Sequence, residues 1–297
     1  MTSPPGALAR RLTDARPDYT SSAFISGAGS GIGRALTLTV LDRGYHVFAG
    51  AYNDAEESSL AESFDARRVT PIVLDVRDEA STQAAATIVG QNLAGIKLKA
   101  VCNIAGVIVN GPLVDLSGAA LSNVLAVNLV GVHNVTRSML PVLGPGSRVV
   151  NMSSASGVRT LPFTGAYSAS KFGLEALTAA MRMEFAPLGI RVSAVAPGMV
   201  RTPMADEIQQ QLRRPPSLEV YAEPVRIVLA KSVASVERGI PMRRVVATIV
   251  SALESTSPSP RYDLHDSWAQ DAVLMRMVPT KVREAVVARV LHLTPTP

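Results

Sequence analysis

Short apolar runs alternate with longer segments rich in Ala and Leu along most of this chain, and this alternation restricts the possible folds more than any other feature. The apolar runs have the length of strands, and the segments between them carry apolar residues at helical spacing. A chain that repeats strand and helix in this way forms right-handed crossovers and a parallel sheet. The expected strands are 22–26, 45–51, 69–74, 98–104, 147–152, 190–196 and a seventh near Arg261, and the expected helices are 33–43, 55–65, 79–92, 122–143, 164–187 and 242–254.

Composition favours one domain. Of the 297 residues, 47% are hydrophobic and only 4% aromatic, as expected for parallel strands covered by helices on both faces. We predict a single α/β domain over 21–265, a Rossmann-type doubly wound parallel sheet of about seven strands. Residues 1–20 are interpreted as a flexible tail and 266–297 as a C-terminal helical extension. Residues 198–240 break the alternation with several prolines and are interpreted as a substrate-binding insertion.

Charge and cysteine content exclude several classes of protein. The net charge is +5, but the arginines are scattered and not interleaved with aromatic residues, so no nucleic acid partner is expected. The single cysteine, Cys102, falls in an apolar strand, which argues against a disulfide framework and favours a reducing, cytoplasmic location. No run of eighteen apolar residues occurs, so no transmembrane segment is expected. The four histidines lie far apart in the sequence, so no metal site is expected.

The first expected strand runs into a glycine-rich loop, Ser26-Gly27-Ala28-Gly29-Ser30-Gly31-Ile32-Gly33, directly before a helix. Glycines let the backbone turn tightly and approach a pyrophosphate, and the free N–H groups at a helix start favour an anion. An ordinary turn is the alternative. The position after the first strand of a strand–helix series favours nucleotide binding.

A second motif, Tyr167-Ser168-Ala169-Ser170-Lys171, places a phenol and an ammonium four residues apart in a predicted helix. The two side chains share one helix face, so the cation is expected to hold the phenol near its ionised form. Taken alone, such a pair also occurs by chance on solvated helix faces.

Together the two motifs resemble those of the short-chain dehydrogenase/reductase family, and the resemblance covers roughly residues 21–262. Further segments follow in the order of that pattern: Asn103-Ile104-Ala105-Gly106 after the fourth strand, Asn128 in the next helix, Ser154 after the fifth strand, and Pro197-Gly198 with Thr202 after the sixth. Within the first of these segments, Ile104 departs from the family pattern, which usually has a second Asn at this position, and we expect altered packing with retained activity.

The resemblance implies an NAD(P)-dependent oxidoreductase that transfers a hydride between a nicotinamide and a secondary alcohol or ketone. Tyr167 would exchange a proton with the substrate oxygen, and Lys171 would lower the pKa of Tyr167 and hold the nicotinamide ribose. Ser154 would donate a hydrogen bond to the same substrate oxygen. Asn128 would hold a water that links Lys171 to solvent. Local hydrogen bonding, as a strand-end cap or to a helix backbone, is the alternative for Ser154 and Asn128.

The resemblance also implies the cofactor contacts. Asp75 is expected at the adenine edge, although capping of the helix from Asp78 is an alternative. Asn103 is expected beside the adenosine ribose, and Thr202 at the carboxamide or the phosphates. The expected contacts are Gly27, Ser30, Gly31, Ile32, Gly33, Asp75, Val76, Asn103, Ala105, Gly106, Tyr167, Lys171, Pro197, Gly198, Val200 and Thr202.

The sequence leaves the choice between NAD and NADP open. The second strand ends in Ala51 and Tyr52, where an acid would select NAD and a base NADP. The missing acid gives a slight preference for NADP, with Arg34 and Asn53 as phosphate partners, but Asp54 is close enough to reverse that preference.

Segments 156–165 and 199–212 carry few charges and predict an apolar pocket for a small-molecule substrate, a lipophilic secondary alcohol or ketone of steroid, retinoid or fatty-chain type. Packing of the same side chains against the core is an equal alternative. The stretch 45–53 and the C-terminal part are similar to the steroid and retinol dehydrogenase branch. The candidate residues are Val158, Leu161, Phe163, Met204, Ile208 and Leu212.

A further helix is expected over 279–293, packed on its own protein, with a cover over the pocket, a docked partner subunit or peripheral membrane contact as alternatives. Its apolar stripe is Val282, Val286, Val290 and Leu293.

The long helices 122–143 and 164–187 pair across subunits in similar proteins, so a homodimer or homotetramer is expected. Two other functions stay open at this point: a nucleotide-sensing, catalytically silent relative, and a carrier-linked ketoacyl reductase.

Overall fold

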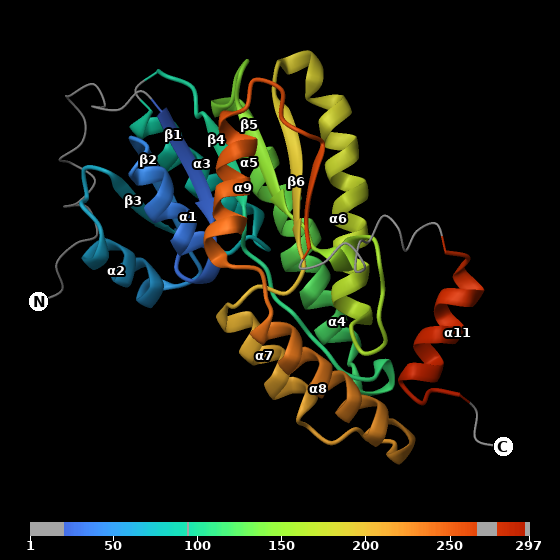
Figure 1. Ribbon diagram of the computed structural model, residues 1–297. Coiled ribbons are helices and arrows are strands. Elements are labelled where there is room, and N and C mark those ends of the chain that lie inside the picture. Colours follow the sequence, from blue (N-terminus) through green and yellow to red (C-terminus); the bar gives the residue numbers. More distant parts are fainter. Residues whose placement is uncertain (1–20, 94, 266–277, 295–297) are drawn as a thin grey trace, which may run out of the picture.

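A parallel sheet of seven strands forms the centre of the protein, in the order β3-β2-β1-β4-β5-β6-β7 (Figure 1). The computed structural model describes residues 21–93, 95–265 and 278–294, so the expected tail 1–20 and the start of the expected C-terminal extension lie outside the described residues. The strands are β1 (Ser21–Ser26), β2 (Tyr45–Ala51), β3 (Val69–Val73), β4 (Ala100–Asn103), β5 (Arg148–Met152), β6 (Arg191–Pro197) and β7 (Arg261–Leu264).

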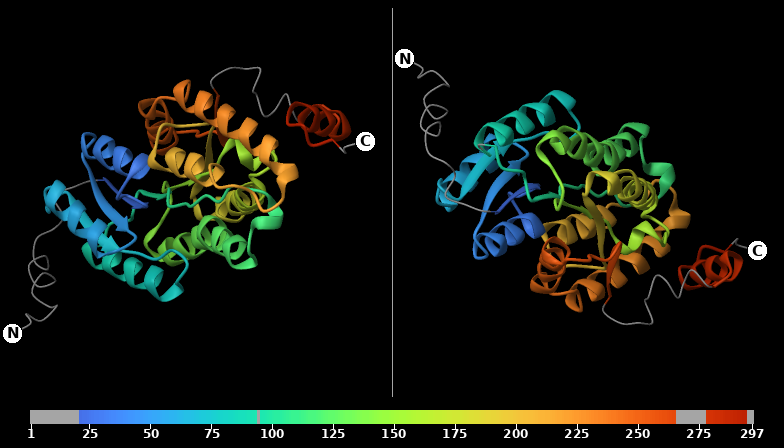
Figure 2. Two further views of the ribbon diagram at one scale, coloured as in Figure 1. Left: turned by 90° about the horizontal axis from the view of Figure 1, so that it is seen from below. Right: turned by 90° about the horizontal axis from the view of Figure 1, so that it is seen from above.

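Helices cover both faces of this sheet, which confirms the predicted doubly wound α/β fold (Figure 2). The strand order reverses between β1 and β4, so the crevice at their carboxyl ends is the place where such sheets bind ligands. The α-helices are α1 (Gly31–Leu41), α2 (Asp54–Ser63), α3 (Glu79–Asn92), α4 (Gly118–Leu125), α5 (Gly131–Met139), α6 (Gly165–Glu184), α7 (Pro203–Leu212), α8 (Ala222–Glu237), α9 (Met242–Glu254) and α11 (Thr280–Val290).

Alternate residues of each strand supply the two layers of the core. In β1, Ala23 and Ile25 pack with the buried side chains of α1 and α9, whereas Phe24 packs on the opposite side with those of α3 and α5. This follows from the two-residue period of a strand, which sends successive side chains to opposite faces. Because both faces are buried, the central strands are mostly apolar, which is why the sequence pattern identified them, and the few polar side chains in them, such as Ser22 and Asn151, are buried as well.

A long helical run over residues 118–142 consists of α4, the π-turn η2 (Ala126–Val130), α5 and the short turn η3 (Leu140–Val142). By length and composition alone this run, with a mean hydropathy of 1.2, passes as a membrane span. It covers one face of the sheet, where α4 lies against α6 and α5 lies against α3. Its apolar side chains therefore serve the packing of that layer.

The insertion between β6 and α9 forms two helices, α7 and α8, which pack on each other beyond the carboxyl ends of the strands (Figure 1). Pro203 opens α7 at a position where the missing N–H costs no hydrogen bond. The loops that follow β1, β4, β5 and β6 thus open toward α7 and α8 and define one functional edge.

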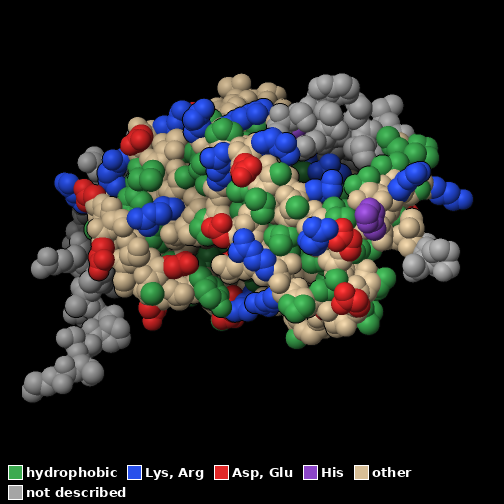
Figure 3. Space-filling model, turned by 60° about the horizontal axis from the view of Figure 1, so that its bottom comes forward, with side chains coloured by type: hydrophobic (Ala, Val, Ile, Leu, Met, Phe, Trp, Pro, Cys, Tyr) green, Lys and Arg blue, Asp and Glu red, His purple; other side chains and the backbone are tan. Residues whose placement is uncertain are grey.

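Basic and acidic side chains are interspersed on the face that Figure 3 shows, with no continuous basic stripe on it. Positive and negative charges are thus mixed over this face.

Candidate functional site

The glycine loop brings the start of α1 against the end of β1. The turn passes through Gly27 and Gly31, whose φ angles are +68° and +51°. A β-carbon at Gly33 would overlap the carbonyl oxygen of Gly27, so glycine at this position is what lets α1 approach the strand so closely. The first amides of α1, at the positive end of the helix dipole, therefore fit the pyrophosphate of a dinucleotide.

One cavity of about 950 Å³ extends from this loop to the ends of β4, β5 and β6 and on to α7, α8 and α11. The volume lies within the range of small-molecule and cofactor sites. Residues of the glycine loop and the side chains of Ser154, Tyr167 and Lys171 line the same cavity. A dinucleotide bound at the loop would thus share one space with these three side chains.

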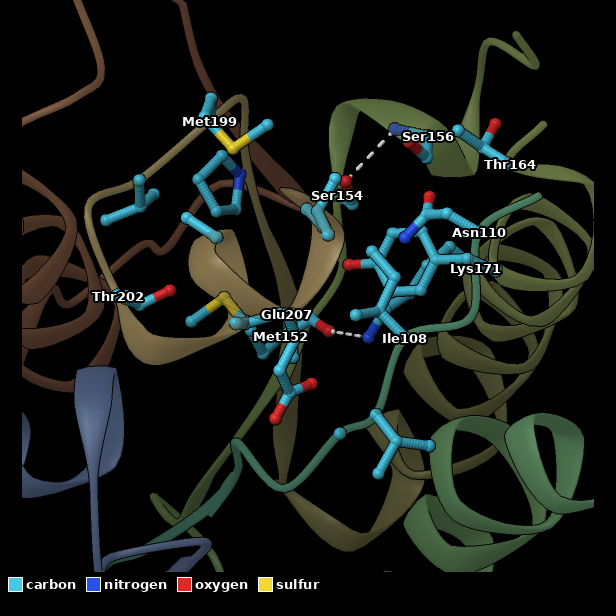
Figure 4. A pocket seen from close by; sticks show the side chains of 18 of the residues that line it. Ile108, Asn110, Met152, Ser154, Ser156, Thr164, Lys171, Met199, Thr202 and Glu207 are labelled. Atoms are coloured by element: carbon cyan, nitrogen blue, oxygen red, sulfur yellow. Dashed lines mark hydrogen bonds between the residues drawn. The ribbon is translucent and has the colours of Figure 1, made fainter. Parts of the chain in front are cut away.

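Ser154, Tyr167 and Lys171 come from the end of β5 and the first two turns of α6. The hydroxyl of Ser154 accepts a hydrogen bond from the amide of Ser156 at 3.1 Å, so the strand-end cap is present as well (Figure 4). Nζ of Lys171 donates to the carbonyl oxygen of Met152 at 2.8 Å and lies 5.6 Å from the ring centroid of Tyr167. The ammonium thus lies over the face of the phenol ring.

Burial controls the pKa values of both side chains in this arrangement. Burial raises the pKa of Tyr167, and a hydrogen bond with the Ser154 side chain lowers it to a smaller extent. Burial lowers the pKa of Lys171 to about 8, against the opposing charge of Glu175. The expectation that Lys171 lowers the pKa of Tyr167 is therefore not met here, because desolvation dominates. A lysine with a pKa of about 8 can both hold and release a proton near neutral pH.

Asn128 ties a strand-end loop to α6. It lies in the π-turn η2 and is fully buried, and its Nδ2 donates to the carbonyl oxygen of Val107 at 2.9 Å and to the hydroxyl of Ser170 at 3.0 Å. Its Oδ1 accepts from the Val107 amide at 2.9 Å. The residue does not line the main cavity. Its geometry is that of a positioning residue, and the water-holding role stays a prediction.

The side chain of Asn103 does not lie where the predicted cofactor contact requires it. Its side chain is buried and donates to Asn151 at 2.8 Å and to Thr136 at 3.0 Å, inside the protein and away from the cavity. The amide is needed there because it connects β4 to β5 and to α5. The side chain of Asn103 therefore ties the sheet together and does not line the cavity.

Asp75 lines the cavity, and its carboxylate pairs with Arg77 at 2.6 Å. Hydrogen bonding to Arg77 holds the pKa of Asp75 below its ordinary value. The alternative that Asp75 caps the following helix is wrong, because Asp78 accepts from the amides of Ala80 and Ser81 at the start of α3. The other predicted contacts that line the cavity are Gly27, Ser30, Gly31, Ile32, Gly33, Val76, Ala105, Gly106, Tyr167, Lys171, Pro197, Gly198, Val200 and Thr202.

The two residues suggested as partners of a 2′-phosphate are engaged elsewhere. The guanidinium of Arg34 donates to Ser63 at 2.8 Å and lies over the ring of Phe64, at the far end of α2. The side chain of Asn53 caps α2 by accepting from the Glu56 amide. Neither residue lines the cavity.

Glu56 is a cavity residue that the sequence reasoning missed. Its Oε2 accepts from the Tyr52 amide at 2.9 Å, and a β-carbon at Gly29 would lie 2.6 Å from the same oxygen. The carboxylate thus lies between the end of β2 and the glycine loop. The signal was present in the sequence, because Asn53 followed three residues later by Glu56 is the pattern of a capping box.

Arg77 and Tyr52 complete this end of the cavity. Arg77 donates to the Tyr52 hydroxyl at 3.1 Å and to Asn123 at 2.9 Å, and its guanidinium lies 5.8 Å from the Tyr52 ring centroid. With its pairing to Asp75, the positive charge of Arg77 is neutralised within the wall of the cavity.

The opposite end of the cavity is mostly apolar. Of the candidate substrate residues, Leu161, Met204, Ile208 and Leu212 line it. Val158 and Phe163 do not, which is a correction: both are buried, and Phe163 packs with Leu212 and Val225 in a satellite core. In the view of Figure 4, Met199 and Thr202 lie across the cavity from Asn110 and Ile108.

The helix α11 contributes to the cavity through Val286, Val287, Val290 and the adjoining Leu291. Leu293 packs on the satellite core, whereas Val282 is about half exposed. The helix thus borders one end of the cavity, while Val286 and Val290 stay about half exposed.

Comparison with known proteins gives consistent matches. The family described as "short chain dehydrogenase" matches residues 21–213. Retinol dehydrogenase 5 of Mus musculus is 32% identical over 289 residues, which span 90% of this chain and 88% of that protein. A short-chain dehydrogenase from Streptomyces avermitilis has a similar fold, with a TM-score of 0.75 and 24% identity over 94% of this chain and all of that one. One from Burkholderia cenocepacia, solved in complex with NADP, has a TM-score of 0.69 and 25% identity over 93% of this chain and 99% of that one.

Proposed function

The chain belongs to the short-chain dehydrogenase/reductase family and is an NAD(P)-dependent oxidoreductase, and from this premise we propose that it interconverts a lipophilic secondary alcohol and its ketone. The observation that carries the proposal is the single cavity that joins the glycine loop to Ser154, Tyr167 and Lys171. Its apolar far end fits a hydrocarbon body next to the polar reacting group.

Ser154, Tyr167 and Lys171 lie at the junction, where the glycine-loop end of the cavity meets its apolar end, and each has a distinct task. When bound, the nicotinamide supplies or accepts the hydride. Burial raises the pKa of Tyr167 above its ordinary value of about 10, so the phenol is fully protonated at neutral pH. In the direction of reduction it gives this proton to the substrate oxygen. Ser154 donates a hydrogen bond to the same oxygen and stabilises the negative charge that develops on it. Lys171, with its pKa of about 8, returns a proton to the site after each turnover.

The end of the cavity between the glycine loop and the ends of β2 and β3 is called the adenosine end below. We assign a preference for NAD over NADP from the charges at this end. Glu56 places a carboxylate between the glycine loop and β2, where the adenosine ribose follows a pyrophosphate bound at the loop. The carboxylate can accept hydrogen bonds from the 2′- and 3′-hydroxyls of NAD. It repels the 2′-phosphate of NADP.

No free cation at this end compensates for that repulsion among the described residues. The basic side chains that line the cavity are Arg77, Arg159, Lys171 and Lys231. Of these, only Arg77 belongs to the β2–β3 side, and Asp75 already neutralises it. The preference for NADP that the sequence suggested relied on Arg34 and Asn53, and neither residue lines the cavity. Glu56, which does line it, carries a negative charge that opposes a 2′-phosphate.

The overall activity is tested by turnover. Purified protein is incubated with NAD⁺ and a panel of secondary alcohols that includes steroids and medium-chain 2-alkanols, and NADH formation is followed by absorbance. Cofactor-dependent oxidation of at least one lipophilic alcohol is expected. Binding of NADH without turnover of any alcohol, or of any ketone in reverse, would instead support the catalytically silent nucleotide sensor.

The cofactor preference is tested by equilibrium titration of NADH and NADPH, followed by fluorescence. Wild type is expected to bind NADH at least tenfold more tightly than NADPH, and Glu56→Gln is expected to reduce that ratio by about tenfold, or ~1.4 kcal/mol. Glu57→Gln is the matched control, because it removes the same charge from a neighbouring position on α2 that does not line the cavity. A ratio that is unchanged in Glu56→Gln contradicts the assignment.

A further inference from the structure

Among the residues that the structure describes, four basic side chains line the cavity, and the surroundings of three of them explain their charge. Arg77 is paired with Asp75, and Lys171 donates to the carbonyl oxygen of Met152 at the junction. Lys231 lies on the exposed side of α8, where water solvates its ammonium. The fourth, Arg159, lies at the mostly apolar end of the cavity, beside the loop after β5 and α7, which is called the substrate end below.

Arg159 occupies the loop between the turn η4 (Ala155–Gly157) and α6. Its side chain lines the cavity and is partly buried, and burial lowers its pKa, with no other cause contributing. Among residues 21–93, 95–265 and 278–294, no carboxylate lies within 4.0 Å of it and no acceptor forms a hydrogen bond with it.

A partly buried arginine without a partner destabilises the protein when no ligand is bound, because its charged guanidinium loses solvation. The guanidinium stays charged at every pH that proteins tolerate, so it cannot escape burial by losing its proton. A partly buried charge without an ion pair or a hydrogen bond loses part of its solvation, and no described side chain replaces that loss. A ligand that brings an anion to Arg159 removes this cost and gains charge-assisted hydrogen bonds, and a carboxylate matches the planar fork of the guanidinium with two parallel bonds.

The side chains around this charge are apolar. Leu161 lies two residues along the same loop, and Ile208 and Leu212 of α7 and Leu291 beside α11 line the same end of the cavity. A ligand that matches both features has a hydrocarbon body and one acidic end. Glu207 of α7 also lines the cavity and repels an acidic end, so the anion is directed to Arg159.

We infer that the substrate of this enzyme is an amphipathic carboxylic acid, an oxo or hydroxy acid whose carboxylate is bound by Arg159 while its alcohol or carbonyl carbon reacts at Tyr167. The inference rests on the proposed function and narrows its substrate class. Four residues separate Ser154 from Arg159, and three of them form the turn η4, so their α-carbons are at most about 14 Å apart. The reacting carbon and the carboxylate are therefore separated by a medium-length chain.

The test is a binding measurement that does not depend on turnover. Decanoate, 1-decanol and methyl decanoate are titrated by calorimetry into the enzyme saturated with NADH. Wild type is expected to bind decanoate at least tenfold more tightly than either neutral compound. Equal affinities for decanoate and for the two neutral probes in wild type overturn the inference without any variant.

The variants identify the residue responsible. Arg159→Gln is expected to weaken decanoate binding at least tenfold while 1-decanol binding stays within twofold, and Arg159→Lys is expected to restore part of the loss. Lys231→Gln, which removes the other cation at this end, is the matched control and is expected to keep the ratio of affinities within twofold. Equal weakening of decanoate and 1-decanol in Arg159→Gln means that the side chain only shapes the cavity, and this overturns the inference.

The failure of this inference is distinguishable from that of the proposed function. If neither NADH nor NADPH binds, or no alcohol or ketone is turned over, the proposed oxidoreductase function fails. The decanoate and decanol titrations, repeated without cofactor, still report on Arg159 alone.

Discussion

The two ends of the cavity differ in how their charges are arranged. At the adenosine end, Arg77 is paired with Asp75, and the Glu56 carboxylate is fixed by the Tyr52 amide. At the substrate end, Arg159 has no partner among the described residues, and its neighbours are mostly apolar. The first end is complete before a ligand arrives, whereas the second leaves one charge for the ligand to satisfy. Fixed charges select between two related cofactors, and an open charge selects a class of substrate.

The two ends also differ in origin. The adenosine end is built from the ends of β1, β2 and β3 and the first turns of α1 and α2, which are parts of the regular fold. The substrate end is built from the loop after β5, the inserted α7 and α8, and the appended α11. Tyr167 and Lys171 lie where the two ends meet.

The largest effect is expected at this junction. Tyr167→Phe removes the proton donor and is expected to lower kcat by roughly 10²–10⁴-fold, while the Kd for NADH stays within twofold. Steady-state kinetics and fluorescence titration measure the two quantities. Tyr262→Phe is the control, since the Tyr262 hydroxyl accepts from the Ser259 amide outside the cavity. Unchanged kcat in Tyr167→Phe would remove Tyr167 from the mechanism.

The next effect tests how far the adenosine end depends on its backbone. Gly33→Ala adds a β-carbon that overlaps the carbonyl of Gly27, so the loop must shift. The Kd for NADH is expected to rise about 100-fold, or ~2.7 kcal/mol. Gly118→Ala is the matched control, because a β-carbon there meets nothing within 4 Å. Normal NADH binding by Gly33→Ala would show that the loop is not the pyrophosphate site.

A third prediction concerns the buried charge at the junction and its dependence on pH. Burial lowers the pKa of Lys171 from 10.5 to about 8. Below pH 8 the folded state must bury an ammonium, and above pH 10.5 the amine is neutral in both states, so this penalty disappears as pH rises between the two values. Relative to Lys171→Met, the free energy of unfolding of wild type without cofactor is expected to increase by about 2 kcal/mol from pH 7.5 to 9.5.

Urea unfolding at the two pH values measures this difference. The raised pKa of Tyr167 affects stability only above about pH 10, outside the chosen window. A difference between wild type and Lys171→Met that does not change with pH would mean that Lys171 is not desolvated.

The smallest effect tests the cover over the substrate end. Leu291→Ala shortens a buried side chain beside α11 that lines the cavity, and the Kd for 1-decanol is expected to rise about fivefold, or ~1 kcal/mol. Val282→Ala, at a position of the same helix that does not line the cavity, is expected to leave that Kd unchanged. Equal effects of the two substitutions would show that α11 does not contact the ligand.

The same division explains what the sequence revealed. The apolar strands follow a strict periodic rule, so the sheet was predicted from local patterns. The expected cofactor contacts came from the resemblance of the motifs to the family, and most of those residues line the cavity. Asn103 was misplaced because its amide serves the interior, and the sequence does not show which way a strand-end side chain points. Glu56 and Arg159 were missed for a related reason. Each is an ordinary charged residue until the fold places it beside the cavity.

The most direct test is whether the two ends of the cavity select their ligands separately. The NADH:NADPH and decanoate:1-decanol ratios of Kd are both determined for Glu56→Gln, for Arg159→Gln and for the double variant. Glu56→Gln is expected to change only the cofactor ratio, by about tenfold, and Arg159→Gln only the decanoate ratio, by at least tenfold. The double variant is expected to show both changes in full. A variant that moves both ratios, or neither, would contradict an adenosine end and a substrate end that select their ligands separately.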